Sequence, residues 1–200
     1  MRQRIEQRLK ERFKIKAFDS VEIFIGIQLQ HTKTHIKLHQ AQFIETLLER
    51  FNMDGCKIAD TPASSTIQQG LSTPLPSNHV YRQLIGSLIY LMATRPDICS
   101  TVVSLSRHLE TPTEANMEAG KRVLRYLAGT THKGVSFRKG NDDHKLVVFS
   151  DSDWAGCKQT RRSTSGFLVY FAGGPISWKS KLQTTTALSS CEAEYVALTL

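Results

Sequence analysis

Near residue 134 the spacing of apolar side chains changes from the helical repeat to the alternation that is typical of β-strands. Beyond this point, strands are predicted at 134–138, 146–150, 165–171 and 175–179, separated by polar or glycine-rich turns. Residues 190–200 then begin a helix. The change of period predicts an α+β or α/β chain. In it, a mixed but mainly helical region precedes a mixed β-sheet with a helix beginning at its C-terminus.

The region before residue 134 is predicted to be mainly helical, with one β-hairpin. Helices are predicted at 2–13, 40–51 and 81–93, with a further helix to about His108, and the hairpin at 21–29 and 35–38. Ile5, Leu9 and Phe13 share one face of the first helix, and basic residues occupy most of the remainder. Residues 54–79 contain several prolines and little periodicity, which is typical of a linker that crosses a surface in extended form.

One helix has a clear start signal. Thr111 fits the N-cap position, Pro112 fits the first helical position, and Glu114 completes a capping box. Gly129 fits the end of the same helix, because glycine is favoured just beyond the last helical residue.

The composition excludes several classes of protein. Of the 200 residues, 40% are hydrophobic and 22% charged, which is typical of folded chains. The net charge of +8 suits a polyanionic partner such as nucleic acid, although a merely basic soluble protein has the same balance. The four cysteines are widely spaced and fit neither a disulfide framework nor a zinc ribbon. With no apolar run long enough for a membrane span and no signal peptide, an intracellular, non-secreted protein is expected.

Two acidic residues stand where a fold can bring distant carboxylates together. Asp151 follows the apolar strand at 146–150, and Glu194 lies in the first turn of the helix that begins near residue 190. Rigid element ends hold carboxylates in fixed positions, and paired carboxylates bind divalent cations that assist phosphodiester cleavage. The pattern makes Asp151 and Glu194 candidate catalytic residues and metal ligands. An exposed strand-end aspartate and a glutamate favoured by the helix dipole are the alternative interpretation.

Two neighbouring acidic residues have separate interpretations. Asp153 lies two residues beyond Asp151 and is either an auxiliary metal ligand or a turn residue. Glu192 lies two residues before Glu194, and in a helix these two side chains point in different directions. They are therefore not expected to share one metal ion.

Basic residues gather at three places that suit phosphate contacts. The candidates for nucleic-acid binding are Arg161, Arg162, Ser163, Thr164, Lys179, Lys181, Lys121, Arg122 and Arg125. The first four precede or enter a strand, where backbone amides, hydroxyls and guanidinium groups can hold a phosphate. A solvated turn or a solvated helix face is the alternative for these clusters. Trp178, beside the first lysine, is expected to be a core residue rather than a platform for base stacking.

An ordered series of motifs runs through the chain. Upstream they are FIGI at 24–27, FNMD at 51–54 and Thr61-Pro62; in the middle, YRQLIGSLIYL at 81–91, TRPDI at 94–98 and AGKRVLRYLAGT at 119–130. Downstream they are SDSDWAG at 150–156, RRSTSG at 161–166, ISWKSK at 176–181 and ALSSCEAEY at 187–195. Together these motifs resemble the Pol polyprotein of copia-type LTR retrotransposons over nearly the whole chain.

The resemblance implies the C-terminal part of a reverse transcriptase joined to the N-terminal part of an RNase H domain. RNase H hydrolyses the RNA strand of an RNA–DNA hybrid with carboxylates and two divalent ions, usually Mg²⁺. By motif, Asp151 matches the first catalytic aspartate and Glu194 matches the helix glutamate. The implied partners are an RNA–DNA hybrid or other nucleic acid and the rest of the Pol polyprotein. No membrane and no small-molecule cofactor beyond the metal are implied.

The resemblance also divides the chain. Residues 1–60 correspond to the palm end and thumb-like part of the reverse transcriptase, and 61–80 to a linker. Residues 81–132 correspond to a helical thumb- or connection-like region, and 133–200 to a truncated RNase H-like sheet.

Two departures from the family pattern limit the expected activity. The 200 residues contain neither the paired-aspartate strand motif of the polymerase nor the third and fourth RNase H carboxylates. A catalytically incomplete chain is therefore expected, with an open edge on a strand that is central in the family's sheet. The alternatives are a non-catalytic nucleic-acid-binding or scaffold protein derived from the element, and a relic without selected function.

Overall fold

The computed structural model describes residues 2–14, 21–64, 72–140, 145–157 and 159–200. The helices in these ranges are α1 (Arg2–Arg12), α2 (Ala41–Arg50), α3 (His79–Leu91), the short 3-10 helix η1 (Pro96–Ile98), α4 (Cys99–Ser106), α5 (Glu114–Ala128) and α6 (Ser190–Leu198). The strands are β1 (Ile23–Phe24), β2 (Ile27–His31), β3 (His35–His39), β4 (Val135–Arg138), β5 (Leu146–Asp153), β6 (Thr164–Phe171) and β7 (Gly174–Leu182).

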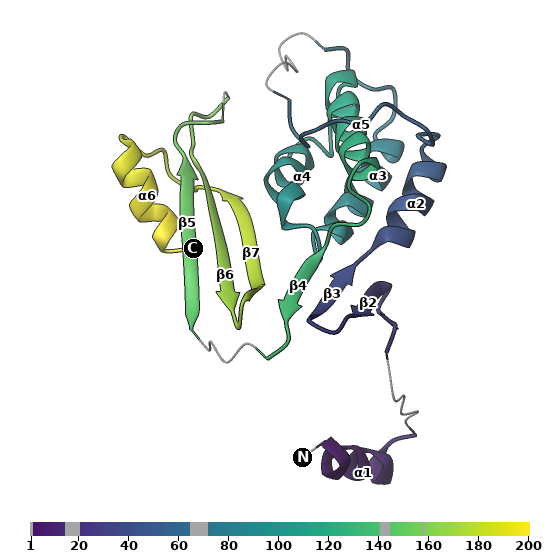
Figure 1. Cartoon of the computed structure of the whole chain (residues 1–200). Coiled ribbons are helices and arrows are strands. Elements are labelled where there is room, and N and C mark those ends of the chain that lie inside the picture. Colours follow the sequence, from purple (N-terminus) through teal and green to yellow (C-terminus); the bar gives the residue numbers. More distant parts are fainter. Residues whose placement is uncertain (1, 15–20, 65–71, 141–144, 158) are drawn as a thin grey trace.

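The described strands pair as two antiparallel sheets, in the orders β1-β2-β3-β4 and β5-β6-β7. Figure 1 shows α2 to α5 as one group above the first sheet, with the second sheet beside them and α6 on the outer side of β5. The α+β form of the predicted fold is therefore confirmed. The parallel pairing that a mixed sheet requires does not occur between the described strands.

The first strand after the change of period joins the N-terminal hairpin. β4 pairs with β3 in a register that sets Val135 opposite Leu38. Gly134 precedes the strand, and a side chain at this position would collide with the Leu38 carbonyl group. Phe137 of β4 packs over Gly174 of β7, which brings the two sheets into contact. The predicted division at residue 133, between a helical region and an RNase H-like part, stays a prediction. Strands β3 and β4 lie on opposite sides of that division in the sequence, but they pair in the same sheet.

The core lies between helices α2 to α5, whose apolar faces point inward. The fully buried side chains include Ile44, Leu47, Tyr81, Leu84, Ile85, Leu88, Leu91, Leu124 and Leu127. Gly120 of α5 lets Leu84 of α3 pack directly against the helix backbone, because a Cβ atom there would collide with the leucine methyl group. The helices predicted at 40–51 and 81–93 are thus confirmed, with their apolar stripes inside.

The start of α5 differs from the predicted one. Thr113 and not Thr111 is the N-cap, because its hydroxyl accepts a hydrogen bond from the backbone N–H of Asn116. The Asn116 side chain accepts one from the backbone N–H of Thr113 (2.9 Å), which completes the capping box. Pro112 stays outside the helix, and its carbonyl accepts a hydrogen bond from the backbone N–H of Leu75 within the predicted linker (2.8 Å). Gly129 is the C-cap, as predicted.

The first helix is confirmed, but its apolar face remains exposed. Ile5, Leu9 and Phe13 keep 54%, 43% and 61% of their surface accessible. Figure 1 shows α1 apart from the other elements. The apolar face of α1 therefore adds nothing to the core formed by the other described residues.

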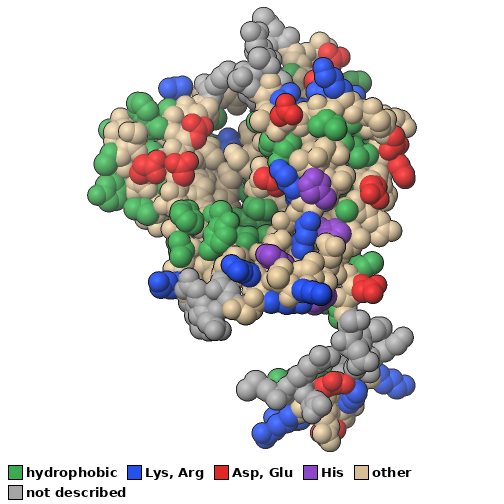
Figure 2. Space-filling view, viewed as in Figure 1, with side chains coloured by type: hydrophobic (Ala, Val, Ile, Leu, Met, Phe, Trp, Pro, Cys, Tyr) green, Lys and Arg blue, Asp and Glu red, His purple; other side chains and the backbone are tan. Residues whose placement is uncertain are grey.

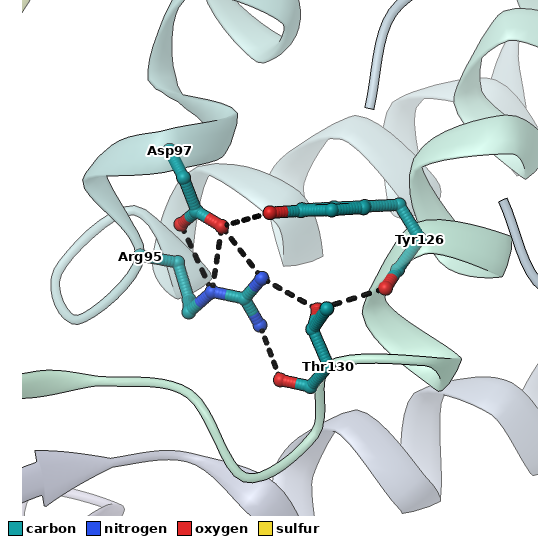
Figure 3. A network of polar contacts seen from close by, with 4 residues as sticks. All are labelled: Arg95, Asp97, Tyr126 and Thr130. Carbon is teal, nitrogen blue, oxygen red and sulfur yellow. Dashed lines mark hydrogen bonds and ion pairs between the residues drawn. The ribbon is translucent and has the colours of Figure 1, made fainter. Parts of the chain in front are cut away.

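A buried guanidinium group joins the end of α3 to α5. Arg95 is 1% exposed, and its Nε and Nη2 donate to the Asp97 carboxylate at 2.9 and 2.7 Å (Figure 3). Its Nη1 donates to the Thr130 carbonyl (3.0 Å), and Nη2 donates to the Thr130 hydroxyl (2.7 Å). The Tyr126 hydroxyl also donates to Asp97 (2.7 Å). Burial alone would raise the pKa of Asp97, but hydrogen bonds from Arg95 and Tyr126, with the Arg95 charge, hold that pKa below its usual value.

Replacing the buried arginine should destabilise the whole chain. Arg95→Ala leaves Asp97 without its counter-charge and removes both donors to Thr130, so the free energy of unfolding should fall by about 3 kcal/mol. Urea unfolding at neutral pH measures the change. Arg138→Ala, which removes an exposed arginine from β4, should change it by less than about 0.5 kcal/mol. Equal effects of the two substitutions would show that the buried network does not stabilise the fold.

Candidate carboxylate site at the end of strand β5

Strand β5 presents alternate side chains on the two faces of its sheet. It extends to Asp153, three residues beyond the predicted end, so the acidic residues belong to the strand itself. Asp151 and Asp153 lie on one face. Ser152 lies on the other face, where it is opposite Ser165 of β6.

Helix α6 packs against the sheet face that carries Ser152. Its N-cap is Ser189, whose hydroxyl accepts a hydrogen bond from the first helical turn (3.1 Å). The buried side chain of Gln183 donates to the Ser165 hydroxyl (2.8 Å) and to the Ala193 carbonyl (2.9 Å). These bonds fix the helix against β6 and set the position of its acidic residues.

Glu194 reaches β5 at the residue next to Asp151. Its Oε1 accepts hydrogen bonds from the backbone N–H (3.2 Å) and the hydroxyl (3.0 Å) of Ser152. This N–H is available because β5 is the last strand in the order of its sheet. Glu192 binds a different group, since its Oε2 accepts from the backbone N–H of Leu188 (2.7 Å).

Asp151 and Glu194 therefore reach the same end of β5 from opposite faces. Among the described residues, no hydrogen bond or ion pair engages the Asp151 carboxylate or Oε2 of Glu194. Carboxylate oxygens are ligands that Mg²⁺ prefers, and one or two carboxylates commonly hold it together with waters and substrate phosphates. The donor chemistry fits that ion. The described part of the chain contains no group of three or more potential His, Cys, Asp or Glu ligands.

Asp153 folds back over the turn that follows β5. Its carboxylate lies against Gly156, where a side chain would collide with it. Ala155, between them, has a φ of 52°, which allows this tight reversal. These contacts favour the interpretation of Asp153 as a turn residue.

A groove of about 1000 Å³ lies between helix α4 and the sheet face that carries Asp151. Figure 2 shows the surface hollowed between these two parts of the molecule. Its lining includes Phe149, Asp151 and Asp153 on the sheet, and Arg107 and His108 at the C-terminal end of α4. Trp178 of β7, which also lines the groove, joins the sheet to the end of α3, because its Nε1 donates to the Met92 carbonyl (2.9 Å). Trp178 is half-buried and thus serves as a structural contact.

Two residues of the groove have shifted pKa values that the sequence pattern did not indicate. Burial lowers the pKa of His108, and the neighbouring Arg107 charge lowers it further. Hydrogen bonds from Thr160 lower the pKa of Cys157 against the effect of burial, with a smaller contribution from Arg107. Neither residue belongs to a recognisable motif, so only the folded arrangement reveals them.

The basic residues around the sheet differ in how far they are open to a ligand. Arg161, Lys179 and Lys181 are exposed, whereas Arg162 and Thr164 are half-buried. Ser163 is fully buried, and its hydroxyl accepts a hydrogen bond from the backbone N–H of Ala155 (3.1 Å). Its hydroxyl is therefore a structural group of the turn rather than a surface group.

The basic residues of α5 are mostly engaged within the chain. Arg122 donates to the linker at residues 61–63, through the hydroxyl and carbonyl groups there (3.0 and 3.1 Å). Arg125 forms an ion pair with Glu118 (2.8 Å). Lys121 is half-exposed. This helix therefore offers less free positive charge than its sequence indicates.

Comparison with known proteins identifies the family. The chain is 42% identical to the retrovirus-related Pol polyprotein from transposon RE1 of Arabidopsis thaliana, over 94% of its own length and 13% of that relative. It is 38% identical to the corresponding polyprotein from transposon TNT 1-94 of Nicotiana tabacum, over 96% of this chain and 15% of the relative. It is also 39% identical to an uncharacterized mitochondrial protein of Arabidopsis thaliana, over 96% of this chain and 80% of that protein.

The chain therefore belongs to the family of copia-type retrotransposon Pol polyproteins, which confirms the resemblance seen in the motifs. It spans 13 to 15% of the length of these polyproteins. No family model and no solved structure matches it. Within the described ranges, every helix is too short or too polar to cross a membrane.

Removing the Ser152 hydroxyl should loosen α6. Ser152→Ala deletes one of the two donors to Glu194, a loss of about 1 kcal/mol, so amide hydrogen exchange in α6 should accelerate roughly fivefold. Ser177→Ala, at an exposed position of β7, is the matched control and should leave exchange in α6 unchanged. Unchanged protection of α6 in Ser152→Ala would contradict the role given to this contact.

Proposed function

We propose that this chain is the part of a reverse transcriptase and RNase H protein where an RNA–DNA hybrid meets the first two RNase H carboxylates. The observation that carries the proposal is the arrival of Asp151 and Glu194 at the same end of β5, beside an open groove. Membership of the Pol family supports it.

Asp151 and Glu194 would hold Mg²⁺ through their carboxylate oxygens. Once bound, the ion would polarise a phosphate group and offset its repulsion by the carboxylates. Ser152 orients Glu194 through two hydrogen bonds, and the exposed strand end keeps Asp151 open to a ligand.

The hybrid would be positioned by the exposed cations of the second sheet. Arg161 lies in the turn before β6, and Lys179 and Lys181 lie on β7, while Asp151 lies on β5. Phosphate contacts of this kind fix the position of a duplex without reading its sequence. Half-exposed Lys121 adds charge from α5.

The 200-residue chain should bind hybrid without cleaving it. Two-ion cleavage of a phosphodiester needs a cluster of carboxylates that clamps both the attacking and the leaving oxygen. The described residues bring no three potential ligands together, so any ion would be held weakly and alone.

A second function, nucleic-acid binding or scaffolding without inherited catalysis, is favoured by the net charge of +8. Among the relatives, the chain covers 80% of an uncharacterized mitochondrial protein, against 13 to 15% of the polyproteins. Both functions require the chain to bind nucleic acid. They differ only in whether Asp151 and Glu194 still hold a metal ion for the hybrid.

A labelled RNA–DNA hybrid incubated with the chain and Mg²⁺ tests the proposal. Neither wild type nor Asp151→Asn should cleave above background. Both should bind the hybrid, with affinity that falls as salt rises because phosphate contacts release counterions. Robust cleavage by wild type that Asp151→Asn abolishes would contradict the proposed incompleteness.

The same binding assay tests the sheet cations. Replacing Arg161, Lys179 and Lys181 together by glutamine should weaken binding and reduce the salt slope by about one per lost cation. Arg50→Gln, which removes an exposed cation from α2, should change neither quantity. Absence of binding at low salt would remove both nucleic-acid functions.

A further inference from the structure

The first sheet has one apolar face and one polar face. Successive side chains of a strand point to opposite faces, and residues paired across antiparallel strands share a face. The register sets Ile36 opposite Phe137 and Leu38 opposite Val135, and these residues form the apolar face. The other face, here called the basic face, carries Gln30, His35, Lys37, His39, Ser136 and Arg138. Strands β2, β3 and β4 contain no acidic residue.

The basic face is separate from the cations proposed to position a hybrid. Phe137, on the apolar face, packs over Gly174 of β7, so the apolar face is the one in contact with the second sheet. Arg161, Lys179 and Lys181 belong to that second sheet and the turn before β6. Figure 2 shows Lys, Arg and His side chains gathered over the first sheet, low in the view.

The two permanent cations of the basic face are open to a ligand. Arg138 is exposed, and Lys37 is half-buried. Among the described residues, no hydrogen bond or ion pair engages either side chain. An apolar neighbour cannot cover this face without burying unpaired charges, which is costly. The face therefore suits an anionic partner.

The N-terminus of α2 adds to the positive potential at one end of this face. Gln28, which is opposite His39 in the register, accepts a hydrogen bond from the backbone N–H of Gln42 (3.0 Å). His39 Nδ1 accepts one from the backbone N–H of Ala41 (3.4 Å). Burial and the Lys37 charge lower the pKa of His39, so its ring is neutral at pH 7 and can accept. The positive end of the α2 dipole thus lies beside the strand that carries Lys37.

The chemistry of the basic face suits an unpaired nucleic-acid strand. His35, Lys37 and His39 recur about every 7 Å along β3, close to the interval between successive phosphates of one strand. Imidazole and guanidinium planes stack on unpaired bases, and polar side chains such as Gln30 bond to their edges. In a duplex the base edges lie inside grooves, which admit a helix or a two-stranded ribbon but not a flat sheet face.

We propose that the basic face binds a single strand of nucleic acid whose backbone runs along β3. Lys37 and Arg138 contact its phosphates, and the exposed ring of His35 stacks on a base. Binding here rests on the proposed function only for the class of ligand. It adds a second surface, which takes the unpaired form of that ligand.

Fluorescence anisotropy of the full chain with a labelled, unstructured polyuridine oligonucleotide tests the phosphate contacts. Lys37→Gln/Arg138→Gln should weaken binding about tenfold. It should also reduce the salt slope by about 1.4, because each contact with a single strand releases about 0.7 of a counterion. Arg50→Gln/Lys57→Gln removes the same charge from exposed positions outside both sheets and should change neither quantity. Circular dichroism verifies that each variant is folded.

A pair of histidines from one hairpin tests the stacking contact. His35→Ala should weaken binding of the oligonucleotide about fivefold, because it removes a ring that stacks on a base. His31→Ala is the matched control and should leave binding unchanged. His31 is also exposed, but it is opposite Ile36 and therefore lies on the other side of the sheet.

The same variants with an RNA–DNA hybrid separate this surface from the hybrid site. The basic-face variants should leave hybrid binding unchanged, and the triple glutamine variant of Arg161, Lys179 and Lys181 should leave single-strand binding unchanged. Failure of the chain to bind hybrid, with single-strand binding retained at the basic face, removes the hybrid site and supports the second surface.

Three results overturn the proposal. The first is no binding of the single strand at low salt. The second is binding that the basic-face variants weaken no more than their controls do, which assigns the single strand to another surface. The third is an equal loss of single-strand and hybrid binding in the basic-face variants, which shows one common surface for both ligands.

Discussion

The short segment at 92–97 connects the helical part of the chain to both sheets. The buried Arg95 guanidinium donates to the carbonyl and hydroxyl groups of Thr130, between α5 and β4. The Thr94 hydroxyl donates to the side chain of Gln40 (2.8 Å), between β3 and α2. The tryptophan of β7 donates to the first carbonyl of the segment. Because an unpaired buried charge is very costly, this segment strongly favours the one arrangement that pairs the Arg95 guanidinium.

The position of the carboxylate site follows from that constraint. The contact between β7 and the segment at 92–97 turns one face of the second sheet toward α4, and the groove lies between them. Asp151 projects to this face, while Glu194 arrives from the other face through Ser152. Because β5 is the last strand in the order of its sheet, the backbone N–H of Ser152 is available to Glu194 at the same strand end that carries Asp151.

Much of the fold was predictable because apolar spacing reports burial directly. The strand predicted at 165–171 is observed at Thr164–Phe171, and the helices predicted at 40–51 and 81–93 are observed at Ala41–Arg50 and His79–Leu91. The N-cap of α5 was misplaced because a bridge between Pro74 and Thr113 delays the helix start, and no local pattern shows it. The burial of Ser163, the contact between Ser152 and Glu194, and the partner of β4 all depend on residues distant in sequence. Motifs located the carboxylates, but only tertiary structure shows the faces from which they approach.

The central claim is that Asp151 and Glu194 form one cation site despite lying on opposite faces of β5. Paramagnetic broadening of backbone amide signals by Mn²⁺, which shares the preference of Mg²⁺ for carboxylate ligands, tests it most directly. Signals of residues 150–154 and 192–196 should broaden together in wild type, and Asp151→Asn should abolish the effect at both. Broadening at only one of these segments, or at neither, would contradict the claim.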